Sequence, residues 1–188
     1  MTEYLAESSP RPRARITGVV YLLYFLTAVL AQFFLSRKQV GYSNAVNVIA
    51  FAFYIALTLL FYSMFKPVNR LLSLIAAFFS LVGCAIGLLG LFPRTALNIN
   101  PLWFFGPYCL LIGTLILRST FMPRLIGWLM VLAGLGWLAF LWPPIARHLS
   151  LVIEVIGIVA EASLMLWLLV MGVNQERWTE QASTVCEG

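Results

Sequence analysis

Six apolar stretches of about 20 residues dominate this chain, and that is the length an α-helix needs to cross a lipid bilayer. They cover residues 16–36, 44–65, 71–92, 102–118, 122–142 and 149–173. Short connections containing charged residues, proline or glycine separate them. Because lipid cannot hydrogen-bond to a free backbone, each stretch is predicted to be a helix. The predicted fold class is therefore an all-α integral membrane bundle of six transmembrane helices.

The composition agrees with lipid as the main surroundings. Hydrophobic residues make up 62% of the 188 positions and charged residues 10%, whereas soluble domains carry about 25% charged residues. The net charge of +5 comes from cations in the connections, without the basic face that nucleic-acid binding needs. We expect membrane lipid as a partner, no nucleic acid, and an oligomeric state that the sequence leaves open.

One transmembrane domain, residues 16–173, is predicted between two polar tails, 1–15 and 174–188, which we expect to be frayed. Its orientation follows from the excess of Lys and Arg on the cytoplasmic side of membrane proteins. With both termini inside, eight cations face the cytoplasm: Arg11, Arg13, Arg15, Lys66, Arg70, Arg118, Arg124 and Arg177. Four face outward: Arg37, Lys38, Arg94 and Arg147. The count favours both termini in the cytoplasm.

Small residues mark places where membrane helices can approach closely. Gly83 and Gly87 form a GxxxG pattern in the third stretch, and Gly127, Gly134 and Gly136 lie in the fifth. The pattern indicates packing within the bundle rather than a dimer face.

Two glutamates inside the last stretch are the strongest candidates for function. The chain has no Asp and seven Glu, of which five lie in the tails and the other two are Glu154 and Glu161. Seven residues are just under two helical turns, so the two carboxyl groups project from one side, about 10 Å apart along the axis. A charge at mid-bilayer costs roughly 3 kcal/mol, and such residues usually face protein or water. The pair is therefore predicted to line an inner cavity.

The expected neighbours of these glutamates are polar side chains at similar depth. For Glu161 they are Tyr24, Thr27, Tyr54, Thr58, Ser80 and Tyr108. For Glu154 they are Gln32 and Asn47, together with Arg147 or Arg94 if those side chains fold inward. The candidate ligand-binding set is Glu161, Glu154, Tyr24, Tyr54, Tyr108 and Asn47. The alternative is structural: Glu161 is a neutral acid whose hydrogen bond to a tyrosine or serine fixes helix packing.

Sequence patterns for cofactor chemistry are absent. The three cysteines are widely spaced, two of them in apolar stretches, and no zinc, P-loop or GxSxG pattern occurs. We expect no metal and no cofactor. Glu161 and Glu154 are then the only catalytic candidates, and whether the chain is an enzyme stays open.

Three functions fit these residues. The leading one is binding or transport of a small lipophilic or weakly basic compound in the glutamate-lined cavity. The second is a cofactor-independent membrane enzyme, such as a terpene-cyclase-like or isomerase-like protein with Glu161 as general acid. The third is a non-catalytic membrane partner, such as an immunity protein, in which no cavity reaches either glutamate.

Four segments resemble one family of multi-pass bacterial membrane proteins, the domain of unknown function DUF4386. They are residues 14–23, 66–77 with Pro-Val-Asn-Arg, 105–138 with Pro-Arg-Leu-Ile-Gly, and 161–174 with Glu161 and a closing Gly-Val-Asn. The resemblance implies a multi-pass protein of the bacterial inner membrane and puts Glu161 within a family motif. The chain departs from the pattern at Pro107 and Tyr108, where relatives often carry histidine, and at Ser80, where they often carry arginine.

Overall fold

The computed structural model describes residues 10–92 and 99–186, and within them every regular element is a helix. In chain order these are α1 (Pro10–Ser36), α2 (Val40–Phe65), α3 (Arg70–Gly90), α4 (Leu102–Arg118), α5 (Arg124–Leu138), the 3-10 turn η2 (Ala139–Leu141), α6 (Pro143–Val170) and α7 (Gln175–Cys186). The predicted all-α class is confirmed. Residues 1–9 of the N-terminal tail and Arg94 lie outside the described residues.

Five helical segments are long and apolar enough to cross a membrane: Arg11–Ser36, Val40–Phe65, Arg70–Gly90, Arg124–Leu141 and Arg147–Val170. α4 is also apolar but has 17 residues, about 25 Å at 1.5 Å per residue. The outer surface carries apolar side chains such as Leu71, Leu125 and Leu151, which are 65%, 71% and 72% exposed. Such a surface suits contact with lipid, and the chain is therefore a helical membrane protein.

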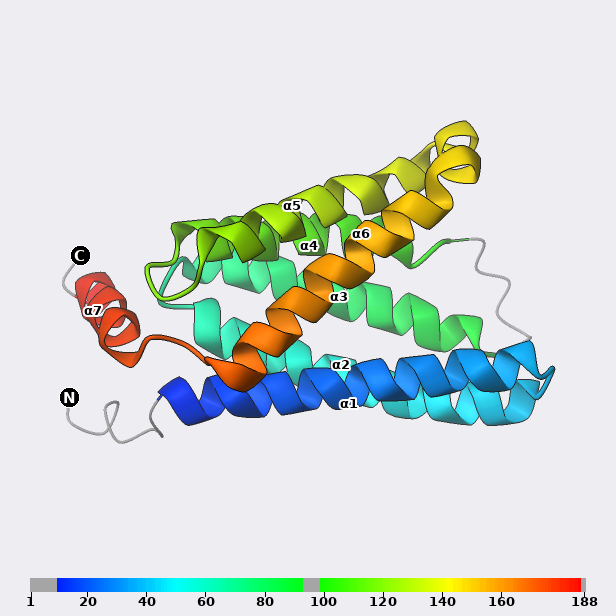
Figure 1. Ribbon diagram of the computed structural model, residues 1–188, viewed down its shortest axis with the longest axis horizontal. Helices are drawn as coiled ribbons and strands as arrows, with labels where there is room; N and C mark the ends of the chain where they lie inside the picture. Colours follow the sequence, from blue (N-terminus) through cyan, green and yellow to red (C-terminus); the bar gives the residue numbers. More distant parts are fainter. Residues whose placement is uncertain (1–9, 93–98, 187–188) are drawn as a thin grey trace.

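The six long helices form a closed ring. Each of α2 to α6 packs against the helix before it, and α6 also packs against α1 (Figure 1). α1 and α2 lie side by side, α4 and α5 form a second antiparallel pair, and α6 crosses the bundle diagonally (Figure 1). We call the end where α1 begins and α6 finishes the terminal end. The other end, where α1 joins α2 and α5 joins α6, is the far end.

Glycine pairs hold α4 and α5 together. A Cβ atom at Gly113 would lie 2.8 Å from the carbonyl oxygen of Gly127, and one at Gly134 would lie 2.9 Å from that of Gly106. On each helix the two glycines are seven residues apart, so they share one face and meet their partners in antiparallel order. The predicted packing at Gly127 and Gly134 is confirmed.

The remaining glycines named from the sequence also face neighbouring helices. Gly83 faces the Phe104 side chain on α4, and Gly87 lies under the ring of Phe51 on α2. Gly136 lies against Ile153 on α6. The GxxxG pattern of α3 therefore serves contacts inside the bundle, as predicted.

The C-terminal tail differs from the prediction, because residues expected to fray form α7. The Nε1–H of Trp178 donates to the Met64 carbonyl at the end of α2, at 3.0 Å. Gln181 accepts from the Thr120 amide at 3.2 Å and donates to the Arg118 carbonyl at 3.3 Å. These bonds satisfy backbone groups that helix ends leave free. They hold α7 across the terminal end (Figure 1).

Several helix limits also differ from the sequence estimates, and two of the differences have a plain physical reason. α1 starts at Pro10 instead of residue 16, because proline suits a first helical turn and the following Arg and Ala residues favour helix. α6 ends at Val170, and Gly172 has a φ of +68° that stops it.

Replacing Gly113 with alanine should destabilise the bundle. The added methyl would overlap the backbone of α5, at a cost of about 1–3 kcal/mol in the free energy of unfolding. Unfolding in dodecyl sulfate mixed micelles, followed by circular dichroism, measures this. Gly90→Ala is the matched control, since a Cβ at Gly90 meets nothing within 4 Å. Equal stability of the two variants would contradict the glycine contact.

Candidate functional site

Glu161 lies inside the bundle where α6 crosses α1. Its side chain is 7% exposed, and its Oε2 accepts a hydrogen bond of 3.1 Å from the Tyr21 hydroxyl. The close crossing depends on Gly18, where a Cβ would lie 2.7 Å from the backbone nitrogen of Leu169. Tyr21 follows Gly18 by three residues and so lies on the same face of α1. Gly18 thus brings the tyrosine within reach of the carboxyl group.

Three further tyrosines extend this contact across the bundle. Ring centroids lie 6.2 Å apart for Tyr21 and Tyr24, 4.7 Å for Tyr24 and Tyr54, and 6.1 Å for Tyr54 and Tyr108. We call these four residues the tyrosine cluster. It joins α1, α2 and α4, and Glu161 adds α6 through the Tyr21 hydrogen bond. Rings at such separations interact favourably in tilted or edge-on arrangements.

One hydroxyl of the cluster lacks a well-formed hydrogen bond. The Oη atom of Tyr54 is buried and makes no hydrogen bond of good geometry with any residue that the structure describes, although the Tyr108 side chain lies within interaction distance of it. A buried polar group in this state recovers only part of the hydration that it loses. The centre of the cluster therefore holds a weakly satisfied hydrogen-bonding group.

The structure brings together Tyr24, Tyr54 and Tyr108, which were chosen only by depth. Tyr21, the residue that actually contacts Glu161, was not chosen. Its signal was present in the sequence: Gly18, Tyr21 and Tyr24 are spaced by three residues, so they share one helix face. Small and aromatic residues on that face mark the side of α1 that packs against the bundle.

Other polar neighbours expected for Glu161 make different bonds. The Thr58 hydroxyl donates to the Tyr54 carbonyl at 2.9 Å and also shares a hydrogen bond with the Ser80 hydroxyl, in which either oxygen can be the donor. This pair links α2 to α3. Thr27 donates to the Leu23 carbonyl of its own helix at 2.8 Å.

Glu154 and Asn47 are not brought to the cluster. Glu154 is exposed, although it precedes Glu161 by seven residues on the same side of α6. Asn47 is half-buried and donates to the Ser43 hydroxyl at 3.4 Å, seven residues before Tyr54 on α2. Both lie nearer the far end than Glu161 and Tyr54.

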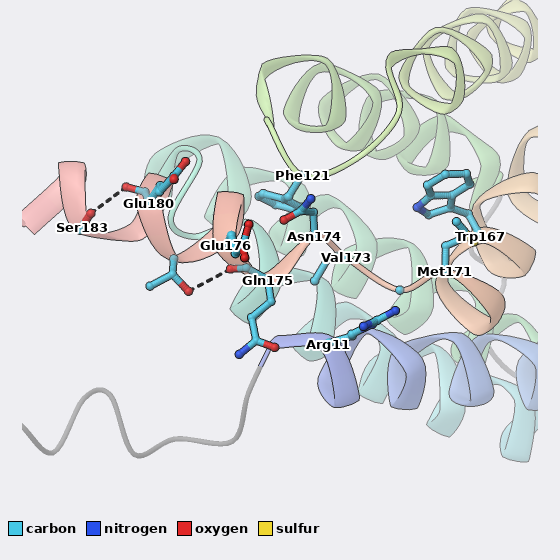
Figure 2. Close-up of a pocket in the computed structure, with 12 residues that line it drawn as sticks. Arg11, Phe121, Trp167, Met171, Val173, Asn174, Gln175, Glu176, Glu180 and Ser183 are labelled. Atoms are coloured by element: carbon cyan, nitrogen blue, oxygen red, sulfur yellow. Dashed lines mark hydrogen bonds between the residues drawn. The ribbon is translucent and has the colours of Figure 1, made fainter.

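Two hollows have been located, and Glu161 lines neither. A small cavity of about 10 Å³ lies beside Thr58, Ser73 and Tyr108, with room for about one water molecule. The Ser73 hydroxyl there is buried and has no partner in the described part of the chain. A wide groove of about 1010 Å³ lies at the terminal end. Figure 2 shows Arg11 and the end of α6 on one side of it, and Glu176 and Glu180 of α7 on the other.

The site offers one carboxyl group and several aromatic faces. A carboxylate can pair with a cation, and tyrosine rings attract cations over their faces. Among the residues that the structure describes, no three His, Cys, Asp or Glu side chains gather as a metal site would require. Chemically, such a carboxyl group can pair with an organic cation, or its hydrogen bond can fix helix packing.

One family model matches most of the chain. It is described as Domain of unknown function (DUF4386) and matches residues 36–99 and 95–172, which include α2 to α6 and Glu161. No curated protein and no solved structure matches the chain.

Replacing Tyr21 with phenylalanine should destabilise the protein by about 1–3 kcal/mol, because the buried Glu161 carboxyl group loses its donor. Tyr54→Phe is the matched control: it removes a buried hydroxyl that makes no well-formed hydrogen bond in the described chain, so the loss of stability should be smaller. Thermal unfolding of both variants in the same detergent makes the comparison. A larger loss in Tyr54→Phe than in Tyr21→Phe would refute this account of the cluster.

Proposed function

Because the chain belongs to the family described as Domain of unknown function (DUF4386), which supplies no activity, we propose from the site itself that it binds a small, lipophilic, weakly basic compound. Glu161 is the counter-charge for the protonated amine. Tyr24, Tyr54 and Tyr108 contact the apolar part of the ligand and the face of its cation. Transport follows if the ligand leaves the site toward the other side of the membrane.

The observation that carries this proposal is the buried Glu161 carboxyl group beside the tyrosine cluster. A carboxyl group in an apolar interior is costly to keep. A protonated amine would offset that cost by donating to the carboxylate, and the rings would add cation–π attraction. Its hydrocarbon part would favour the membrane interior over water.

Binding requires the tyrosine rings to separate. Tyr21, Tyr54 and Tyr108 are 2%, 4% and 3% exposed, so a ligand must displace packed side chains to reach Glu161. The Tyr54 hydroxyl, which makes no well-formed hydrogen bond, could then bond to the ligand. The cluster is thus proposed as a site that opens with its ligand.

A second candidate is supported by the same hydrogen bond and by the fact that Glu161 lines neither of the two hollows described above. In a non-catalytic membrane partner, the Tyr21–Glu161 contact would serve only to join α1 to α6. The two candidates differ in one respect: only the first makes the charge of Glu161 necessary for binding an amine.

Glu161→Gln should weaken amine binding at least about tenfold, since a glutamine cannot pair with a cation. The probe is phenylbutylamine, titrated into the protein in lipid nanodiscs by calorimetry, with empty nanodiscs subtracted. Phenylbutanol is the uncharged control ligand. The control variant is Glu180→Gln on α7, which makes the same chemical change outside the spanning helices.

Unfolding curves of the Glu161 variant establish that it is folded. Wild-type protein that binds the amine no better than the alcohol would refute the proposed function. Unchanged amine affinity in Glu161→Gln would do the same.

The location that we propose is the bacterial inner membrane, with six spans including α4 and both termini in the cytoplasm. Eight of twelve cations then lie on the inner side. A fluorescent protein fused after Gly188 should fluoresce, whereas alkaline phosphatase fused there should be inactive. Fusions in the connection between α1 and α2 should behave oppositely. Active phosphatase at the C-terminus would reverse the proposed orientation.

A further inference from the structure

The face of α6 that buries Glu161 becomes exposed toward the far end. Glu161 and Met165 are 7% and 8% exposed where α6 crosses α1. On the same side of the helix, Ile158 is 57% exposed and Glu154 is also exposed. α6 therefore diverges from α1 on the far-end side of Glu161, which agrees with the diagonal path of α6 across the bundle (Figure 1).

α1 shows the same change on its facing side. Gly18 and Tyr21 are buried against α6 or the core. Val29 follows Gly18 by eleven residues, about three turns, and so lies on the same face, but it is 65% exposed. Gln32, near that face, is exposed too. Beyond the Tyr21–Glu161 contact, neither helix covers the other.

These exposed faces of the two helices meet at Glu161. We call them the α1–α6 faces, and they consist of Val29 and Gln32 on α1 and of Glu154 and Ile158 on α6. They turn toward lipid when the bundle lies in a membrane. Of these four residues, Val29 and Ile158 are apolar and Gln32 and Glu154 are polar. A lipophilic compound dissolved in the bilayer would meet these faces first.

Glu154 indicates what kind of compound this is. It lies inside a spanning segment, Arg147–Val170, yet it is exposed on a largely apolar surface. Within the described chain it has no hydrogen-bond or ion-pair partner. A carboxyl group in such a place needs a compensating cation or donor. An amine with an apolar tail supplies the cation, and its tail suits the lipid around it.

Building on the proposed function, we infer that weakly basic compounds reach Glu161 sideways from the lipid, between α1 and α6, and that Glu154 receives them first. The amine pairs with Glu154 while the Tyr21–Glu161 contact is intact. It then moves about 10 Å along α6 to Glu161, the distance that seven helical residues span. No passage from the aqueous ends of the bundle is needed.

Association rates test this route. Phenylbutylamine, added to nanodisc-embedded protein in a stopped-flow instrument, should associate at least about threefold more slowly with Glu154→Gln, because the attracting charge is gone. Phenylbutanol association should not change. Ile158→Trp should slow both compounds by narrowing the space between the helices.

Val159→Trp is the matched control for the tryptophan. Val159 is 50% exposed and adjacent in sequence, but it is turned about 200° from Glu161 around α6. Glu180→Gln controls for the loss of a carboxyl group.

The two proposals fail in different ways. The lateral route would be overturned if the amine associated with Glu154→Gln and Ile158→Trp at the wild-type rate. The proposed function would still stand if Glu161→Gln lost amine binding. A change of oligomeric state in Glu154→Gln, seen by light scattering and accompanied by unchanged rates, would also overturn the lateral route, because a second copy would then cover Glu154. Wild-type protein that binds phenylbutylamine no better than phenylbutanol would refute both the lateral route and the proposed function.

Discussion

The ring of helices closes at the crossing of α6 over α1, and that contact depends on the missing side chain of Gly18. A methyl group there would meet the backbone of Leu169 at 2.7 Å. Because no side chain lies between them, the two backbones come close enough for dispersion forces to hold them together. Dispersion matters in a membrane because the hydrophobic effect does not drive helices to associate in lipid. The same approach sets the Tyr21 hydroxyl against Glu161. The same α1–α6 contact therefore closes the ring of helices and forms the Tyr21–Glu161 hydrogen bond.

Much of this fold could be predicted because lipid restricts the possibilities. A backbone in hydrocarbon must bond to itself, so an apolar stretch of suitable length has to be a helix. The close contacts at Gly127 and Gly134 could be predicted for a related reason, since small residues face helix neighbours in membranes. α7 could not be predicted in this way. Its docking depends on Trp178 and Gln181 meeting backbone groups of α2 and α4, which are distant in sequence.

The sequence predicted at what depth in the bilayer the site residues lie, but not which of their side chains contact one another. Glu161 stood out because a carboxyl group is rare inside a spanning helix, and Tyr24, Tyr54 and Tyr108 were selected as residues at its level. Depth alone did not identify Tyr21 as the residue that contacts the carboxyl group. Nor did it show that Glu161 is buried and Glu154 exposed, since both lie on one side of α6. Their environments differ because α6 crosses α1 at an angle, a property of the packed bundle rather than of either helix.

The docking of α7 has a mechanical consequence. Hydrogen bonds to the carbonyls of Met64 and Arg118 tie the ends of α2 and α4 to the same short helix, and the glycine contacts lock α4 to α5. These contacts lie at the terminal end of the bundle or between α4 and α5. On the opposite side of the bundle, the facing residues of α1 and α6 are exposed beyond the Tyr21–Glu161 contact. α1 and α6 are therefore expected to separate more easily than α4 and α5, because their facing sides are already exposed toward the far end, at Val29 and Ile158.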